Sequence, residues 1–221
     1  PFPFIRDEVN YGHPAFAANG TTLFFSSDAP EGQGGHDIYF TQMDGEGKWA
    51  DPINLGTFIN TIGQEQYPTV YKDTLFYSSD RLAGLGGLDI FKTYLNAEGQ
   101  WVPPINLRSP LNSGADDFGL IVDTFAASEE NVLMQGFFTS SRGGAARNDD
   151  IFAFTLKGIQ PGTDIVVVPN NEVPKEKPVD YQIFVSIRVM EPQFEVPDDP
   201  NSKRIGKKAL PNGPIIITEG L

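Results

Sequence analysis

The sequence predicts an all-β protein: a β-propeller, with three four-stranded blades visible as part of a larger ring, followed by the start of a β-sandwich. The first observation behind this prediction is a repeat with a period of 52 residues, for example from Leu23 to Leu75. The second is the alternation of apolar and polar residues in short β-branched and aromatic blocks, without helical periodicity. Four strands in a unit of about 50 residues are typical of a propeller blade.

The repeat is carried by blocks of similar sequence at constant spacing. Residues 23–28, 34–39 and 52–55 recur as residues 75–80, 86–91 and 104–107, each shifted by 52 positions. A third, more divergent copy has matching blocks at 137–142 and 150–152, displaced by a further 61 to 62 positions. The added length falls near residues 128–131, where we expect a longer loop. The copies span about residues 11–61, 65–113 and 116–157.

In the first copy we expect strands at about residues 14–17, 22–27, 37–42 and 52–55. Asn19-Gly20, Gly34-Gly35 and Asp44-Gly45 supply the turns between them. Three wedge-shaped blades do not complete a circle, because propellers use about four to eight. We therefore expect either further blades N-terminal to these residues, which the pattern favours, or an open array capped by a partner.

The repeat pattern ends near residue 164, so residues 1–164 are assigned to the propeller blades. Residues 165–180 then form a Pro-rich, charged linker that should be extended. Alternation returns at residues 182–189, and an apolar run follows at 214–218. Because two strands do not make an independent domain, we interpret residues 181–221 as part of a carboxypeptidase-regulatory-like β-sandwich.

Composition excludes several classes of function. The 221 residues contain 16 Lys and Arg against 29 Asp and Glu, a net charge of −13, which disfavours binding to nucleic acid or to anionic lipid. The absence of cysteine excludes disulfide bonds and thiolate metal sites. The apolar runs are far shorter than the roughly 20 residues of a membrane helix.

The repeated carboxylates are the first candidates for a site. Asp28 and Asp37, and their counterparts Asp80 and Asp89, flank a Gly-rich loop, while the third copy keeps Asp150 and has Arg142 in line with the first carboxylate. Such pairs are able to bind calcium, or to accept backbone N–H groups and hold a tight turn. Their recurrence at equivalent places favours the structural role.

Other residue types point away from catalysis. The two histidines, His13 and His36, occupy different places in one copy, which argues against a two-histidine metal site. Trp49 and Trp101 could stack on sugars, but their equivalent positions favour packing. The Ser-Ser-Asp runs lack a nucleophile elbow and a partner histidine. We therefore predict no catalytic residues, no metal, no cofactor and no enzymatic activity; the binding residues are not identified by the sequence.

Residues 13–16, 23–28, 34–39 and 49–55, with their counterparts in the other copies, resemble the WD40-like, TolB-type propeller repeat. Over about residues 4–157 the chain is similar to large OmpA-family envelope lipoproteins of Bacteroidota, including the PorE type associated with type IX secretion and gliding motility. This resemblance implies a tetratricopeptide region, a propeller, a regulatory-like sandwich and a peptidoglycan-binding OmpA-like domain in the full protein. The peptidoglycan-binding motif lies outside this chain.

The resemblance implies a non-enzymatic scaffold at the periplasmic face of the outer membrane. Its expected partners are outer-membrane or type IX secretion proteins, such as a PorP/SprF-like barrel, with peptidoglycan held through the domain outside this chain. The alternative is a carbohydrate-binding or carbohydrate-active propeller with two carboxylates about 5 to 9.5 Å apart.

Overall fold

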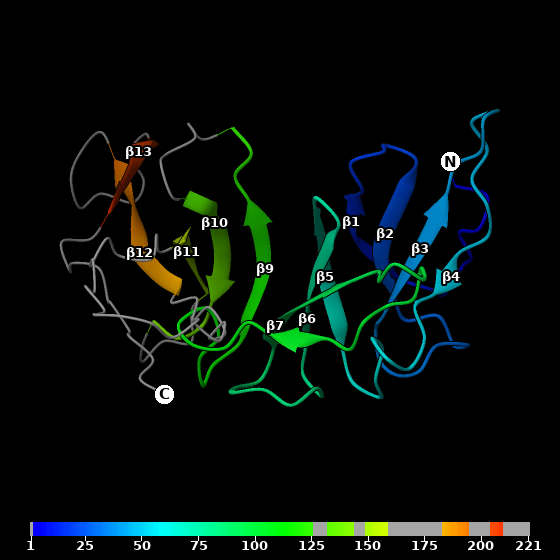
Figure 1. Ribbon diagram of the computed structural model, residues 1–221, viewed down its shortest axis with the longest axis horizontal. Coiled ribbons are helices and arrows are strands. Elements are labelled where there is room, and N and C mark those ends of the chain that lie inside the picture. Colours follow the sequence, from blue (N-terminus) through cyan, green and yellow to red (C-terminus); the bar gives the residue numbers. More distant parts are fainter. Residues whose placement is uncertain (1, 126–131, 144–148, 159–182, 195–203, 210–221) are drawn as a thin grey trace, which may run out of the picture.

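The computed structural model describes residues 2–125, 132–143, 149–158, 183–194 and 204–209. These residues form strands, turns and irregular segments and contain no helix. Three antiparallel sheets follow one another along the long axis in chain order (Figure 1). The prediction of an all-β protein is thus confirmed.

The first two sheets each have four strands in sequence order. Sheet 1 contains β1 (Tyr11–Phe16), β2 (Thr22–Ser27), β3 (Asp37–Gln42) and β4 (Ile53–Asn54). Sheet 2 contains β5 (Glu65–Tyr71), β6 (Thr74–Ser79), β7 (Asp89–Tyr94) and β8 (Ile105–Asn106). The strands expected in the first copy are all present, with the first displaced toward the N-terminus and the fourth reduced to two residues.

Sheet 3 has five strands in the order β13-β12-β11-β10-β9. It contains β9 (Asp117–Val122), β10 (Val132–Ser140), β11 (Asp150–Gly158), β12 (Ile183–Phe194) and β13 (Arg204–Ala209). The fourth strand of this sheet, β12, comes from the far side of the Pro-rich stretch and pairs with β11 from Phe152↔Val189 to Gly158↔Ile183. The predicted linker, residues 165–180, and the predicted strand at 214–218 lie outside the described residues.

Each middle strand sends alternate side chains to opposite faces of its sheet, and both faces are covered. We call the face toward the preceding sheet the leading face and the face toward the next sheet the trailing face. Phe24 and Ile38 on the trailing face of sheet 1 pack with Leu75, Tyr77 and Phe91 on the leading face of sheet 2. Apolar cores therefore fill the two junctions, one between sheets 1 and 2 and one between sheets 2 and 3.

The second junction repeats the first with equivalent residues. Phe76 and Ile90 on the trailing face of sheet 2 pack with Phe138, Phe152 and Phe154 on the leading face of sheet 3. The leading face of sheet 1 has no sheet before it among the described residues, and Phe2 and Phe4 pack there instead. The ring of Phe4 stacks on Phe25 with a centroid distance of 5.7 Å.

The trailing face of sheet 3 differs because its apolar side chains are exposed. Phe24, Ile38, Phe76 and Ile90 are 6% exposed or less in sheets 1 and 2. Their counterparts in sheet 3, Phe137 and Ile151, are 38% and 44% exposed, and Ile121, paired with Phe137, is 60% exposed. An apolar face that is buried twice in the repeat is therefore open in its third copy.

Backbone hydrogen bonds join the sheets at one end. The Glu65 N–H donates to the His36 carbonyl over 2.7 Å, and the Asp117 N–H donates to the Leu88 carbonyl over 2.6 Å. In both cases the first strand of one sheet is bonded to the residue just before the third strand of the preceding sheet. These bonds therefore hold the loops at this end in place relative to the neighbouring sheets.

Candidate functional site

Asparagine side chains hold both junctions at this end of the sheets. The Asn112 side chain accepts from the Ile90 N–H and donates to the Ile90 carbonyl, both over 2.8 Å. Asn60 makes the same pair of bonds to Ile38, over 2.8 and 2.9 Å. Because both asparagines are 1% exposed, each satisfies a buried backbone pair that water does not reach. The loop before each next sheet is thereby locked to the third strand of the sheet it follows.

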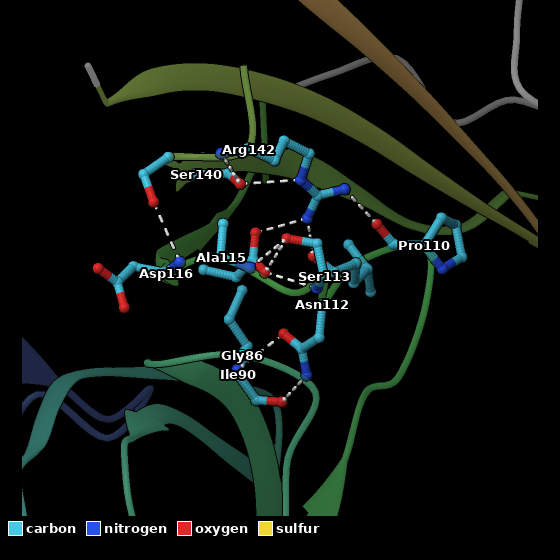
Figure 2. A network of polar contacts seen from close by, with 12 residues as sticks. Gly86, Ile90, Pro110, Asn112, Ser113, Ala115, Asp116, Ser140 and Arg142 are labelled. Atoms are coloured by element: carbon cyan, nitrogen blue, oxygen red, sulfur yellow. Dashed lines mark hydrogen bonds and ion pairs between the residues drawn. The ribbon is translucent and has the colours of Figure 1, made fainter. Parts of the chain in front are cut away.

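The junction of sheets 2 and 3 contains a buried ion pair (Figure 2). The Asp117 carboxylate, fully buried, accepts from the Ser113 N–H over 2.6 Å and from the Ser113 hydroxyl over 2.8 Å. Its other oxygen lies 2.5 Å from the Arg142 guanidinium. Arg142 thus neutralises a carboxylate that would otherwise be charged and alone in the core.

The Arg142 guanidinium is enclosed on several sides. It donates to the Pro110 carbonyl over 2.7 Å, to the Leu111 carbonyl, and to the Ser140 hydroxyl over 2.8 Å. It also lies 5.2 Å from the ring centroids of Phe138 and Phe152, within the range of a cation–π contact. This side chain is therefore a structural part of the junction rather than a surface cation.

The strand registers correct the sequence alignment of Arg142. Ser140 pairs with Asp117 as Ser79 pairs with Glu65, so Ser141 is equivalent to Asp80 and Arg142 is equivalent to Arg81. The hydrogen bonds agree, since the Ser141 hydroxyl accepts from the Asp116 N–H as Asp80 accepts from the Gln64 N–H. Arg142 therefore does not replace the first carboxylate of the pair; Ser141 does.

The junction of sheets 1 and 2 also contains a buried carboxylate, but hydroxyl and backbone groups bind it in place of an arginine. Glu65, fully buried, accepts from the Thr61 N–H and hydroxyl, both over 2.7 Å, and from the Ser79 hydroxyl over 2.6 Å. The Tyr77 hydroxyl donates over 3.4 Å to the Ile59 carbonyl, the counterpart of the Leu111 carbonyl that Arg142 binds. Burial raises the pKa of the Glu65 carboxyl, opposed by these hydrogen bonds.

Arg81 consequently lies outside this junction. Its side chain is 64% exposed, and its guanidinium is 4.0 Å from Asp80, a carboxylate that already binds a backbone N–H. Beside it is an open pocket of about 420 Å³. The pocket is lined by Gln33, Thr57, Asn60, Thr61, Ile62 and Arg81. Arg81 is the one charged residue among them, which makes this pocket a candidate site for an anionic group.

The third-strand aspartates hold the Gly-rich turns. Asp37 accepts from the Gln33 N–H over 2.5 Å, and Asp89 accepts from the Leu85 N–H. A Cβ atom built on Gly32, Gly84 or Gly143 would lie 1.7 to 2.5 Å from the nearest oxygen of Asp37, Asp89 or Asp150, respectively. Each of these turns thus requires glycine because a carboxylate lies against its backbone.

The paired carboxylates have different partners. Asp28 accepts from the Asn10 N–H over 2.7 Å and from its side-chain amide over 2.6 Å, contacts that lower the pKa of Asp28. Asp37 and Asp89 each keep one buried oxygen, Oδ1, without a hydrogen-bond partner in the described structure. Within the described ranges no three His, Cys, Asp or Glu residues gather as metal ligands would.

The tryptophans contact other aromatic side chains. Trp101 packs edge-on against Phe24 of sheet 1, with ring centroids 6.2 Å apart. Trp49 lies 5.3 Å from Phe2 and 6.1 Å from Phe16. Both tryptophans form single bridges within their own sheets, Met43↔Trp49 and Leu95↔Trp101. These contacts are those of packing residues.

A row of rings crosses the first strands of the three sheets. His13 lies 4.0 Å from Tyr67, and Tyr67 lies 4.8 Å from Phe118, between ring centroids. His13 and Tyr67 stand at β-bulges with φ of 52° and 56°, values that are uncommon for residues other than glycine. Burial lowers the pKa of His13 and raises that of Tyr67. The neutral form of His13 is thus favoured in this row.

The sequence candidates did not include four buried residues of the junctions, Glu65, Asp117, Asn60 and Asn112, or the exposed Arg81 beside the pocket. Asn60 and Asn112 share the 52-residue spacing, as do Glu65 and Asp117, so the signal was present in the repeat. His36 bonds Gln64 over 2.8 Å, and its charge adds to the burial that lowers the pKa of His13.

Neither a protein-family model nor a curated protein matches the sequence. The part of the chain that the structure describes includes no helix with the length and hydropathy of a membrane span.

Proposed function

We propose that the three sheets are blades of a β-propeller that acts as a non-enzymatic docking scaffold. The observation that carries this proposal is that the repeated acidic residues are buried and hold the structure together. Asp37, Asp89, Glu65 and Asp117 are 1% exposed or less and accept hydrogen bonds from neighbouring loops. Because these carboxylates hold turns and junctions, they are not available as a catalytic acid–base pair facing solvent.

The propeller geometry is supported by the way that the sheets pack. Each sheet covers the trailing face of the one before it, and the first strands β5 and β9 lie against the preceding sheet. The exposed trailing face of sheet 3, with Phe137 and Ile151, fits a further blade of the same kind. A closed ring of such blades gives a rigid body with broad faces for protein contacts.

The proposed setting follows from the family resemblance of the repeats. We place the protein at the periplasmic face of the outer membrane, as part of an OmpA-family lipoprotein of the PorE type, with outer-membrane or type IX secretion proteins as partners. A PorP/SprF-like barrel is one such partner, and peptidoglycan anchoring belongs to a domain outside this chain. The net charge of −13 favours a partner with a basic patch for long-range attraction.

The test is affinity capture of the intact protein from cross-linked cell envelopes. The proposal predicts specific recovery of an outer-membrane or secretion component, and recovery of peptidoglycan through the full-length protein. A variant with Lys48→Gln in the exposed turn between β3 and β4 serves as a surface control. Recovery of no envelope protein above background would contradict the docking function.

The alternative, carbohydrate binding, is favoured by one observation, the row of His13, Tyr67 and Phe118 rings on the first strands of the three sheets, β1, β5 and β9. Aromatic side chains supply apolar surface and, in Tyr and His, polar tips for hydroxyl groups. A glycan that binds with an affinity reduced at least about tenfold by Tyr67→Ala would establish this alternative. If the protein is carbohydrate-active, it should turn over a glycan, and Asp37→Asn or Asp89→Asn should abolish that turnover. Absence of any turnover would contradict this form of the alternative.

A further inference from the structure

The two junctions use equivalent arginines in opposite ways. Arg142 and Arg81 each stand two residues after a serine whose hydroxyl accepts their own backbone N–H, over 3.2 and 3.3 Å. Arg142 turns inward to Asp117 and to two carbonyl groups. Arg81 is mostly exposed, and its one ion pair is long, at 4.0 Å.

Two substitutions between the copies explain this difference. Glu65 replaces Asp117, and its longer side chain bonds both Thr61 and Ser79, so that no cation is needed to occupy its oxygens. Tyr77 replaces Phe138, and its hydroxyl takes the carbonyl group that would bind the guanidinium. The groups that bind the Arg142 guanidinium in one junction are therefore already bonded in the other, and the guanidinium of Arg81 lies beside the pocket instead.

The pocket beside Arg81 is suited to a carboxylate with an apolar neighbour. Its volume of about 420 Å³ accommodates one or two side chains, and its polar lining consists of two threonines, Asn60 and Gln33. Ile62 in the lining is 83% exposed, and Phe58, next to Thr57, is 67% exposed. Arginine is one of the residue types enriched in binding hot spots, and here it lines the pocket together with an exposed aliphatic side chain.

The surroundings of the pocket are fixed, which favours binding. Asn60 is locked to Ile38 by two hydrogen bonds, and the Thr61 N–H and hydroxyl are bonded to Glu65. The Gly35 N–H donates to the Gly63 carbonyl over 2.7 Å, which joins the loops on either side. A ligand therefore has to order little more than the Arg81 side chain.

We propose that this pocket docks a partner peptide through an acidic side chain that pairs with Arg81, with an adjacent aliphatic or aromatic residue of the peptide on Ile62. The guanidinium offers two parallel N–H donors to one carboxylate, which gives direction as well as charge. The inference rests on the proposed docking function and names the chemistry of the partner. The acidity of the rest of the protein limits the partner to an isolated acidic residue rather than an acidic run.

The experiment uses a random peptide library displayed on phage, selected against the full chain. Recovered peptides are synthesised, and their affinities are measured for the wild type, Arg81→Gln, Ile62→Ser and the control Lys48→Gln. Lys48 is a matched control because it is also an exposed cation near a carboxylate, Glu46. Thermal unfolding of each variant confirms that the surface changes leave the fold intact.

The proposal predicts peptides with one Asp or Glu next to a Leu, Ile or Phe. Arg81→Gln weakens their binding at least about tenfold, Ile62→Ser weakens it several-fold, and Lys48→Gln leaves it unchanged. Changing the acidic residue of the peptide to its amide has the same effect as Arg81→Gln, and the two changes together are not additive. Selection of basic peptides, selection of none, or binding that survives Arg81→Gln overturns the proposal.

The outcomes separate this site from the docking function as a whole. If an envelope partner is captured and binds Arg81→Gln as tightly as the wild type, the pocket proposal fails and the docking function stands. If acidic peptides bind through Arg81 but no envelope partner is captured, the docking function fails and the pocket proposal stands.

Discussion

Replacement of Arg142 by methionine tests the buried ion pair at the junction of sheets 2 and 3. The change keeps most of the apolar stem and removes the charge that faces Asp117, which is fully buried. Breaking a buried pair by removing one partner costs about 3 to 5 kcal/mol, because the remaining charge is left unpaired. The Pro110 and Leu111 carbonyls lose their donors in addition.

The expected loss is large on the scale of whole-protein stability. For a chain of this size, each kcal/mol corresponds to about 2 to 4 °C in Tm, so Arg142→Met is expected to lower Tm by about 6 to 20 °C. Urea unfolding followed by tryptophan fluorescence measures the free energy of unfolding, since the partly buried Trp101 packs against the core of the first junction. The double variant Arg142→Met with Asp117→Asn should recover part of the loss, because no buried charge remains.

Arg81→Met is the matched control, because it makes the same chemical change at the equivalent position. Arg81 is 64% exposed with a 4.0 Å ion pair, so its replacement should alter the free energy of unfolding by less than about 0.5 kcal/mol. Equal effects of Arg142→Met and Arg81→Met would refute the assignment of different roles to the two arginines.

Three further predictions concern other buried groups. Burial raises the pKa of Glu65 above its ordinary value of 4.5, so ionisation of this carboxyl lowers the stability of the fold as the pH rises through and above 4.5. In urea titrations Glu65→Gln should therefore gain stability relative to the wild type over this pH range. A gain confined to acidic pH would contradict this prediction. Burial lowers the pKa of His13 below 6.5, so the stability that neutral His13 contributes to the fold is lost as the pH falls below 6.5. His13→Asn keeps a residue type that tolerates the positive φ and should make Tm decline less steeply below pH 6.5. An unchanged slope of Tm against pH would argue against this role of His13. Asn112→Ala leaves the Ile90 N–H unpaired in the core, whereas the Ile90 carbonyl keeps its bond from the Leu107 N–H. The change should cost about 1 to 3 kcal/mol in urea unfolding, and an unchanged free energy of unfolding would show that water replaces the amide.

Much of the fold could be predicted because its strands are local and repeated. The blocks at residues 22–27 and 37–42 have strand alternation and turn residues beside them, and β2 and β3 begin and end at those residues. The first strand is predicted to begin at residue 14, whereas β1 begins at Tyr11. The difference arises because β1 contains a bulge, with His13 at positive φ, which breaks the alternation of apolar residues. Periodicity locates regular strands better than bulged ones.

The alternation at residues 182–189 indicated a strand, which β12 contains, but its place as the fourth strand of sheet 3 could not be predicted from local pattern. In sheets 1 and 2 the fourth strand follows the third within one copy, whereas β12 begins 25 residues after β11 ends, at Ile183 against Gly158. Pairing across such a distance depends on sheet geometry rather than on sequence periodicity. The assignment of residues 181–221 to a sandwich stays a prediction.

The candidate site was only partly visible in the sequence. The aspartates at 28, 37, 80 and 89 were found because they recur with the period, but the partners of these carboxylates are loop N–H groups that no side-chain pattern reveals. Arg142 was aligned one position away from its structural counterpart because the third copy is divergent. The different roles of Arg81 and Arg142 depend on hydrogen bonds that Glu65 makes with Ser79 and that Tyr77 makes with Ile59, and these bonds form between segments that only the fold brings together.

The accessibility of the trailing face of sheet 3 in the native polypeptide tests the propeller proposal most directly. Because these 221 residues contain no cysteine, an Ile151→Cys change places one thiol on this face, and Ile53→Cys, on the exposed β4, provides the reference. The unsubstituted native polypeptide gives the background labelling. The propeller predicts slow labelling of Cys at position 151 in the intact native protein and rapid labelling at position 53. Equally rapid labelling at both positions, with the fold intact, would contradict it.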